Sequence, residues 1–173
     1  MLIIHKWITG VGIRETDELE EGCWVNLFEP MPDELTRVTQ TFRLPPTFLT
    51  DPLDKDERSR VELDEDDNCV LIVLRVPYHD TSLDSIPFIT VPFGIIIAPK
   101  AVVTVCARRT ALTTEFTEHM RRVCPPTERY RFAFQILLYA ALLYLRNLRE
   151  ISNAADLIER DLHKALRNET LIA

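Results

Sequence analysis

An acidic segment at residues 51–67 holds the side chains of this sequence that are best suited to chemistry. Nine carboxylates against three basic side chains give the segment a net charge of −6, out of −7 for the whole chain. Crowded carboxylates repel one another unless cations or basic partners neutralise them, and hard oxygen ligands suit Mg²⁺ or Ca²⁺. The segment therefore predicts either a weak site for a hard divalent cation or a solvated acidic loop.

One known type of calcium site can be tested directly against this segment. Asp64, Asp66 and Asn68 match the first three ligand positions of an EF-hand loop. Cys69, however, replaces the turn glycine, and Arg75 falls where the bidentate glutamate belongs. The segment is therefore not an EF-hand.

Enzyme chemistry finds little support elsewhere in the chain. No nucleophile elbow, P-loop or H-E-x-x-H motif occurs, and the four histidines and four cysteines are scattered without metal-ligand spacing. Gly10-Val11-Gly12 is interpreted as a plain turn, because Glu15 stands where a dinucleotide-binding turn needs its third small residue. The acidic net charge disfavours nucleic-acid binding. We expect no enzyme activity, no nucleic-acid partner and reduced cysteines in a cytoplasm.

Apolar, β-branched runs predict the elements that must position the acidic segment. Strands are expected at residues 1–7, 23–28, 69–76, 88–97 and 101–106. The last three runs are almost continuously Val, Ile and Leu, which is typical of strands buried on both faces. The sequence therefore predicts an α/β domain with helices on both sides of the sheet.

Helical patterns and breakers refine this prediction. Apolar spacing predicts a helix at 33–42, and a short helix or turn is expected at 47–53. Pro92 and Gly94 interrupt the fourth strand, which suggests an edge position or a bulge there.

A long helix is predicted from Thr127, as N-cap, to about residue 168. At 1.5 Å per residue it would be about 60 Å long, so it must either project from the domain or fold back. Its first half, residues 132–145, is apolar nearly all round and is expected to be buried. We therefore divide the chain into an α/β domain at 1–126 and a helical region at 127–173.

The second half of this helix is amphipathic, with an apolar heptad seam of the kind that packs along another helix. The seam consists of Leu148, Ile151, Ala155, Ile158, Leu162 and Ala165. No second helix remains in the chain to receive it. We expect a chain truncated before further helices, with dimers or crystal contacts through residues 148–166.

Several fragments, in order along most of the chain, resemble the CorA family of divalent-cation transporters. The matching fragments are Trp24-Val25-Asn26-Leu27 with Pro30; Pro46 to Asp54; Arg58 to Glu62; Leu71 to Leu74; Phe93 to Ile97; Val102 to Val105; and Tyr130 to Glu150. Asn26 and Thr50 stand where the family has acidic residues, and the acidic turn before Leu71 is about two residues longer than usual.

This resemblance implies an α/β/α sandwich with a mixed sheet of about six to seven strands covered by helices on both faces, followed by a long C-terminal helix. It also implies a cytoplasmic regulatory domain of a homopentameric transporter, anchored in the cell membrane by helices that this chain lacks. A weak regulatory Mg²⁺, or another divalent cation, would lie between subunits. The matching ligand positions are Asp64, Glu65, Asp66 and Asp67.

Two alternatives stay open at this point. One is a zinc-transporting relative within the same family, which residues before the pore do not distinguish. The other is a stand-alone soluble binding module that dimerises through its C-terminal helix.

Overall fold

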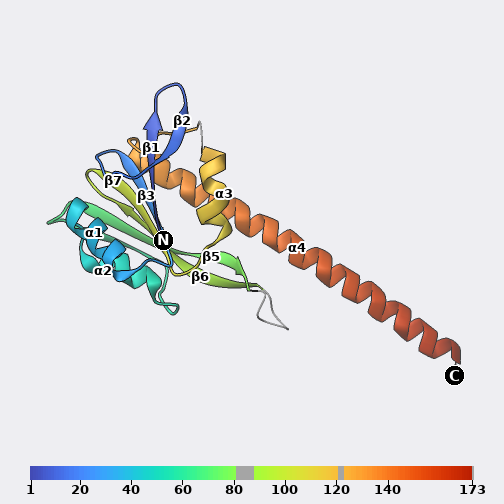
Figure 1. Ribbon diagram of the computed structural model, residues 1–173. Helices are drawn as coiled ribbons and strands as arrows, with labels where there is room; N and C mark the ends of the chain where they lie inside the picture. Colours follow the sequence, from blue (N-terminus) through green and yellow to red (C-terminus); the bar gives the residue numbers. More distant parts are fainter. Residues whose placement is uncertain (81–87, 121–122, 173) are drawn as a thin grey trace.

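A seven-stranded mixed sheet forms the centre of the molecule, in the order β2-β1-β3-β7-β6-β5-β4 (Figure 1). The computed structural model describes residues 1–80, 88–120 and 123–172. β3 and β7 run parallel, and all other neighbouring strands pair antiparallel. The strands are β1 Leu2–Ile8, β2 Gly12–Thr16, β3 Cys23–Phe28, β4 Arg60–Asp64, β5 Cys69–His79, β6 Phe88–Ile97 and β7 Ala101–Cys106.

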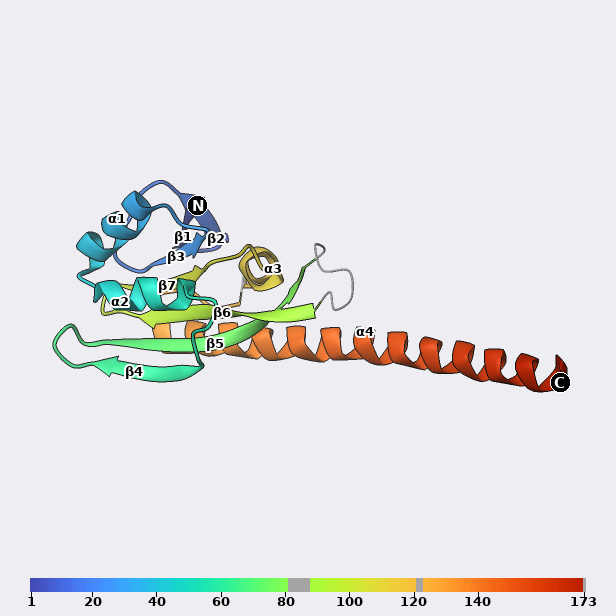
Figure 2. The same ribbon diagram turned by 90° about the horizontal axis from the view of Figure 1, so that it is seen from below.

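Helices cover both faces of this sheet, as the continuous apolar strands predicted. The helices are α1 Pro32–Phe42, α2 Pro46–Thr50, the 3-10 helix η1 Asp51–Leu53, α3 Ala111–Met120 and α4 Arg129–Ile172. Figure 2 shows α1 and α2 on one side of the sheet and α4 along the other. The expected α/β/α sandwich with a long C-terminal helix is therefore confirmed.

Two apolar cores result, because successive side chains of a strand point to opposite faces. In β6 and β7, Ile96 and Val103 pack under α1 and α2, whereas Ile95 and Val102 pack under α3 and α4. All four side chains are fully buried. The central strands thus have no solvent-facing side, which is why their sequences show no alternation.

Three elements were not anticipated from the sequence. β2 is a short strand that starts at a glycine, and β4 is a short strand inside the acidic segment. The helix α3 is rich in threonine, which weakens its helical signal. Phe116 and Leu112 nevertheless bury α3 against the sheet and α4.

The edge position suggested by Pro92 is wrong, because β6 lies between β5 and β7. Pro92 is tolerated there because β7 ends at Cys106, which pairs with Phe93. The β6–β7 ladder therefore stops one residue short of Pro92. The Pro92 carbonyl faces the Cys106 thiol at 3.2 Å. The backbone nitrogen of Pro92 is therefore directed beyond the end of β7, and its lack of an N–H removes no hydrogen bond from the ladder.

Gly94 serves a close approach rather than a bulge. A Cβ at this position would lie 2.5 Å from Cγ of Pro52, in η1, and 2.9 Å from Cγ1 of Val105. The glycine thus lets η1, the start of the acidic segment, sit directly on the sheet.

The long helix α4 lies along the sheet with its first half and then projects away from the domain (Figures 1 and 2). It begins at Arg129, two residues after the predicted cap Thr127, and the Glu128 carbonyl accepts from the Phe132 N–H. Its buried face is narrow, formed by Phe132, Ile136 and neighbouring residues.

The prediction that the first half of this helix is buried all round is wrong. Its outer side chains are 46–67% exposed; they are Tyr130, Phe134, Leu138, Leu142 and Leu145. The reason is geometric, because a single sheet covers only one side of a helix. From residue 151 to residue 164 every side chain is exposed.

Candidate functional site

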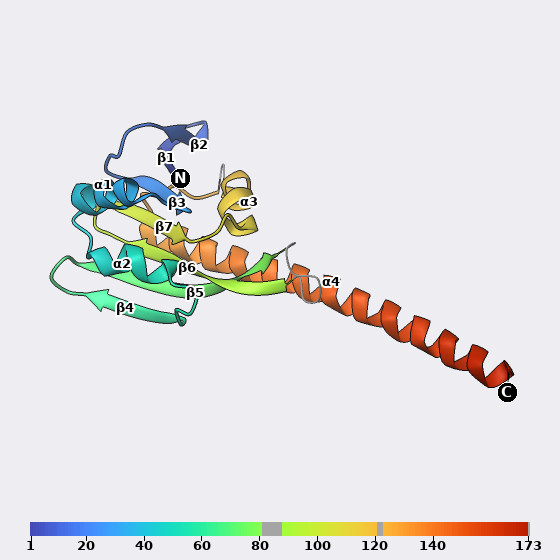
Figure 3. The same cartoon turned by 60° about the horizontal axis from the view of Figure 1, so that its bottom comes forward.

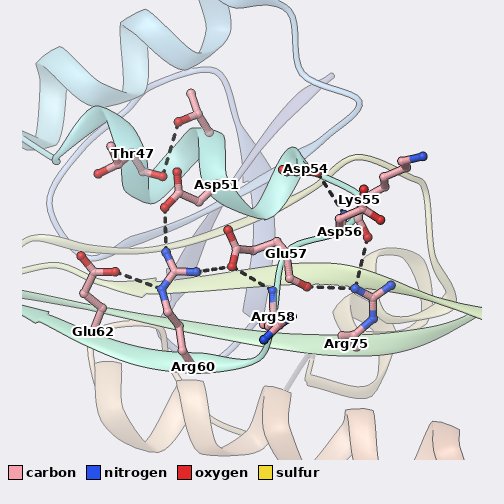
Figure 4. Close-up of polar contacts among 11 residues, drawn as sticks. Thr47, Asp51, Asp54, Lys55, Asp56, Glu57, Arg58, Arg60, Glu62 and Arg75 are labelled. Carbon is pink, nitrogen blue, oxygen red and sulfur yellow. Dashed lines mark hydrogen bonds and ion pairs between the residues drawn. The ribbon is translucent and has the colours of Figure 1, made fainter.

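The acidic segment divides into two parts with different electrostatics. The first part is organised by Arg60, the first residue of β4, whose guanidinium contacts three carboxylates (Figure 4). Nη2 lies 2.7 Å from Asp51 Oδ2, and Nε lies 3.1 Å from Glu62 Oε2. Nη1 donates to Glu57 Oε1. The side-chain hydrogen bond to Glu62 is the main cause that raises the pKa of Arg60. One positive charge is thus shared among three carboxylates, which lowers their mutual repulsion.

Arg75 of β5 fixes the loop between η1 and β4 from the other side. Its guanidinium donates to the backbone carbonyls of Lys55 and Glu57, at 3.2 and 2.9 Å. It also donates to Thr90 of β6. Arg75, which occupies the position of the bidentate glutamate in an EF-hand, thus ties the acidic loop to β5 and β6.

The second part is the β4–β5 hairpin, which carries all four predicted metal ligands. Asp64 is the last residue of β4 and pairs with Cys69, so Glu65, Asp66 and Asp67 lie in the connecting turn. The three turn acids are exposed, and Asp64 is half-buried. Asp64 Oδ1 accepts from the Asp67 N–H at 2.8 Å. None of these four side chains forms an ion pair with any residue that the structure describes.

The charge of the acidic segment is therefore concentrated at one tip of the sheet. Oxygen donors of this kind fit Mg²⁺ or Ca²⁺. Within the described residues, however, no group of three His, Cys, Asp or Glu side chains converges closely enough to hold a metal. A metal at this hairpin would need ligands beyond those of one chain, or water.

Cys69 behind the turn does not add a soft ligand. Burial raises the pKa of its thiol to about 11, and the carboxylates of Asp64 and Asp67 add to the increase. The thiol is also fully buried, whereas the three turn acids are exposed. The exposed donor atoms of these side chains are thus oxygens.

A second polar site, under α3, escaped the sequence reasoning. The Trp24 indole N–H donates to Thr104 Oγ1 at 3.0 Å, and this hydroxyl donates to Asn26 Oδ1 at 3.0 Å. The Asn26 amide in turn donates to the Thr113 carbonyl. All of these groups are buried. An aspartate at position 26 could not donate to Thr113, which gives a physical reason for asparagine where the family pattern has an acid.

His5 borders this network and stacks on Trp24, with ring centroids 4.5 Å apart. The side chain is 2% exposed, and its Nδ1 has no hydrogen-bond partner among the described residues. Burial lowers the pKa of His5 to about 4. The sequence signal for this site was a histidine within an apolar strand.

Comparisons with known proteins agree with this architecture. The complete CorA magnesium transporter of Methanocaldococcus jannaschii matches with a TM-score of 0.75 and 20% identity, covering 94% of this chain and 51% of the transporter. The soluble domain of the same protein matches with a TM-score of 0.70 and 18% identity, covering 94% of this chain and 64% of that domain. The ZntB cytoplasmic domain of Vibrio parahaemolyticus matches with a TM-score of 0.61 and 12% identity, covering 88% of this chain and 63% of the ZntB domain. At these identities the structures show the fold alone.

The chain spans about half to two thirds of the length of these structures. No curated protein sequence matches it. Among the described residues no helix is both long enough and apolar enough to cross a bilayer. The sequence model of the family described as CorA-like Mg²⁺ transporter protein matches residues 20–173, which is nearly the whole chain. The chain therefore belongs to the CorA family of ion transporters.

Proposed function

We propose that this chain is the cytoplasmic regulatory domain of a CorA-like transporter of Mg²⁺ or another divalent cation. The family match over residues 20–173 is the observation that carries the proposal. The full protein is proposed to be a homopentamer at the cell membrane, with this domain on its cytoplasmic face. The domain itself performs no covalent chemistry.

The regulatory step is proposed to act through the β4–β5 hairpin. Asp64, Glu65, Asp66 and Asp67 are held at the tip of a two-stranded extension, and the described residues leave their charge unneutralised. A cytosolic divalent cation bound between these carboxylates and a neighbouring subunit stabilises the closed assembly. When the cation leaves, repulsion favours the open state, so the cation shifts a population through its differential affinity.

Binding to a single copy is expected to be weak. Mg²⁺ holds its waters tightly, and one chain offers no converging set of three ligands within its described residues. Calorimetry on the 173-residue chain should therefore give Mg²⁺ affinity no tighter than the millimolar range. Tight, stoichiometric Zn²⁺ binding would instead favour a zinc-specific domain.

Uptake by the full-length protein in liposomes tests the regulatory role. Neutralising the hairpin (Asp64→Asn, Glu65→Gln, Asp66→Asn, Asp67→Asn) should let uptake continue when Mg²⁺ is high on the cytoplasmic side. A matched control neutralises four exposed carboxylates outside the hairpin, namely Glu18, Glu21, Asp54 and Asp56. Unchanged inhibition in the hairpin variant, or equal release in the control, contradicts the proposed sensor.

A zinc transporter of the same family is the second candidate, because the ZntB cytoplasmic domain shares the fold. The same liposome assay separates the two with Mg²⁺ and Zn²⁺ as competing substrates. Transport of Zn²⁺ without Mg²⁺ would establish the second candidate.

A further inference from the structure

The long helix α4 leaves the sheet near Leu143 and Tyr144. Leu143 is the last buried side chain among those of α4 that the structure describes, and Tyr144 is half-buried next to it. The Tyr144 hydroxyl donates to the backbone carbonyl of Arg75, in β5, at 3.0 Å. This hydrogen bond ties the point at which α4 leaves the sheet to the strand that follows the acidic hairpin.

The register of the sheet explains why the Arg75 carbonyl accepts from a side chain. Arg75 lies opposite Pro92 of β6, whose carbonyl faces β7. The two residues are therefore a non-hydrogen-bonded pair of the antiparallel ladder, and the backbone groups of Arg75 point away from β6. On that side β4 begins only at Arg60, opposite Val73. No strand of the described chain thus reaches the Arg75 carbonyl, and Tyr144 supplies the donor.

Arg75 is also connected to the acidic segment in two ways. Its guanidinium holds the backbone carbonyls of Lys55 and Glu57, in the loop that leads into β4. Its strand, β5, starts at Cys69, directly after the charged turn of the hairpin. Six residues of extended strand separate Cys69 from Arg75, which is about 20 Å. A single residue of β5 thus contacts the acidic loop with its side chain and α4 with its carbonyl.

Two further polar contacts hold α4 on the domain. At the start of the helix, the Arg129 guanidinium donates to the Ala98 carbonyl at 2.6 Å, between β6 and β7. Near the exit, Tyr139 and Arg146 each contact Glu115 of α3 at 2.9 Å. Figure 3 shows α3 on one side of α4 and the ends of β5 and β6 on the other. The helix therefore leaves the domain between an anchor on β5 and an anchor on α3.

The length of α4 turns a small movement at the exit into a larger one at its end. The contact at Arg129 lies about 22 Å along the axis from Tyr144, and the C-terminal end of α4 lies about 64 Å from Arg129. Figure 2 shows the helix continuing from the sheet to its end without a break. If α4 turns about Arg129 as one rod, a shift of about 1 Å at Tyr144 moves the far end by about 3 Å.

We propose that the hydrogen bond between Tyr144 and Arg75 couples the cation state of the β4–β5 hairpin to the direction of α4. The inference rests on the proposed sensor and names the route by which it acts. A cation that draws the hairpin carboxylates toward a neighbouring subunit also turns β5, which holds Tyr144. This edge of the sheet is the part best placed to move, because β4 has a neighbouring strand on one side only. In the proposed transporter the membrane helices follow this chain, so the swing of α4 is directed toward them.

Three Tyr→Phe variants test this coupling, because each removes one hydroxyl from α4 and keeps the ring. Tyr144→Phe breaks the contact to β5, Tyr139→Phe breaks the contact to Glu115, and Tyr130→Phe changes a side chain that is 62% exposed. In the full-length protein in liposomes, Tyr144→Phe should raise the cytoplasmic Mg²⁺ concentration that halves uptake by about 2- to 12-fold, the range of one neutral hydrogen bond. Tyr139→Phe and Tyr130→Phe should leave it unchanged. Equal shifts in all three variants, or no shift in Tyr144→Phe, would overturn the coupling.

Combining Tyr144→Phe with the neutralised hairpin separates coupling from a purely structural role. If Tyr144 acts by relaying the state of the hairpin, its substitution should change nothing further once the four carboxylates are gone. Additive effects would mean that Tyr144 acts independently of the hairpin. Full inhibition in the hairpin variant itself would show that both the sensor and this route are wrong. Release in the hairpin variant, with Tyr144→Phe behaving like Tyr130→Phe, would leave the sensor standing and refute the route alone.

Spin labels on the 173-residue chain test the anchor without any transport assay. Labels at Gln40→Cys, on α1, and Arg160→Cys, on α4, occupy two exposed positions. The four native cysteines are buried, and the unmodified chain serves as the labelling control. Tyr144→Phe should shift or broaden the distance between the labels, whereas Tyr130→Phe should not, with circular dichroism unchanged in both. Identical distances in the parent chain and in Tyr144→Phe would show that this bond does not set the direction of α4, and the proposal would fall.

Discussion

His5 should make the stability of this domain depend on pH in a way that a single substitution removes. The imidazole is stacked on Trp24, almost fully buried, and without a partner for Nδ1 among the described residues. Burial disfavours the charged form and lowers its pKa from 6.5 to about 4. Above pH 6.5 the imidazole is neutral in both the folded and the unfolded chain, so it contributes no pH dependence there.

Between pH 6.5 and about 4 the unfolded chain binds a proton that the folded chain does not. The free energy of unfolding therefore falls as the pH falls, by up to about 1.4 kcal/mol per pH unit. The whole interval corresponds to about 3 kcal/mol. Glu15 and Glu118 line the cavity beside His5, and their charge, if felt at the imidazole, would make the loss smaller.

Urea unfolding of the wild type and of His5→Phe, at several pH values between 7.5 and 4.5, isolates this contribution. Phenylalanine keeps the stacking on Trp24 and removes the unpartnered nitrogen, so the variant should be no less stable at pH 7.5. Titration of the carboxylates and other histidines is common to both proteins and cancels in the difference. The difference should grow to about 2 kcal/mol in favour of the variant by pH 4.5.

Two outcomes would refute this reasoning about His5. One is a parallel loss of stability in the wild type and the variant across the whole range. The other is a His5 pKa above 6 in an NMR titration of the folded chain, which would mean that water or a carboxylate compensates for the burial.

Three further substitutions test the packing that holds the acidic segment and the α3 site. Gly94→Ala forces a methyl group against Pro52 and should lower the free energy of unfolding by about 1–3 kcal/mol; an unchanged urea midpoint would show that η1 can shift freely. Thr104→Val leaves the Trp24 indole N–H without its acceptor and should cost about 2–4 kcal/mol, whereas Thr104→Ser should retain most of the stability. Arg60→Gln leaves three carboxylates close together and should cost only about 1 kcal/mol, less at high salt, because the network is partly exposed; a salt-independent loss would point to packing instead.

Much of the fold could be predicted from local sequence. The strands at β5, β6 and β7 and the start of α1 follow from residue type and spacing alone, because buried strands and amphipathic helices have strong periodic signals. The ordered fragments beginning at Trp24 indicated the CorA family, which the family match confirms. The acidity of residues 51–67 was likewise visible in the sequence.

Long-range contacts decided the rest. The sequence shows nine acids in one segment, but not how they are divided. The tertiary structure brings Arg60 beside three of them and leaves Asp64 to Asp67 as a separate charged tip. Pro92 suggested an edge strand, because the local sequence does not contain the position at which the neighbouring strand β7 ends. Likewise, an all-round apolar helix indicates burial, yet the sheet covers only one side of α4 and leaves its outer apolar side chains exposed.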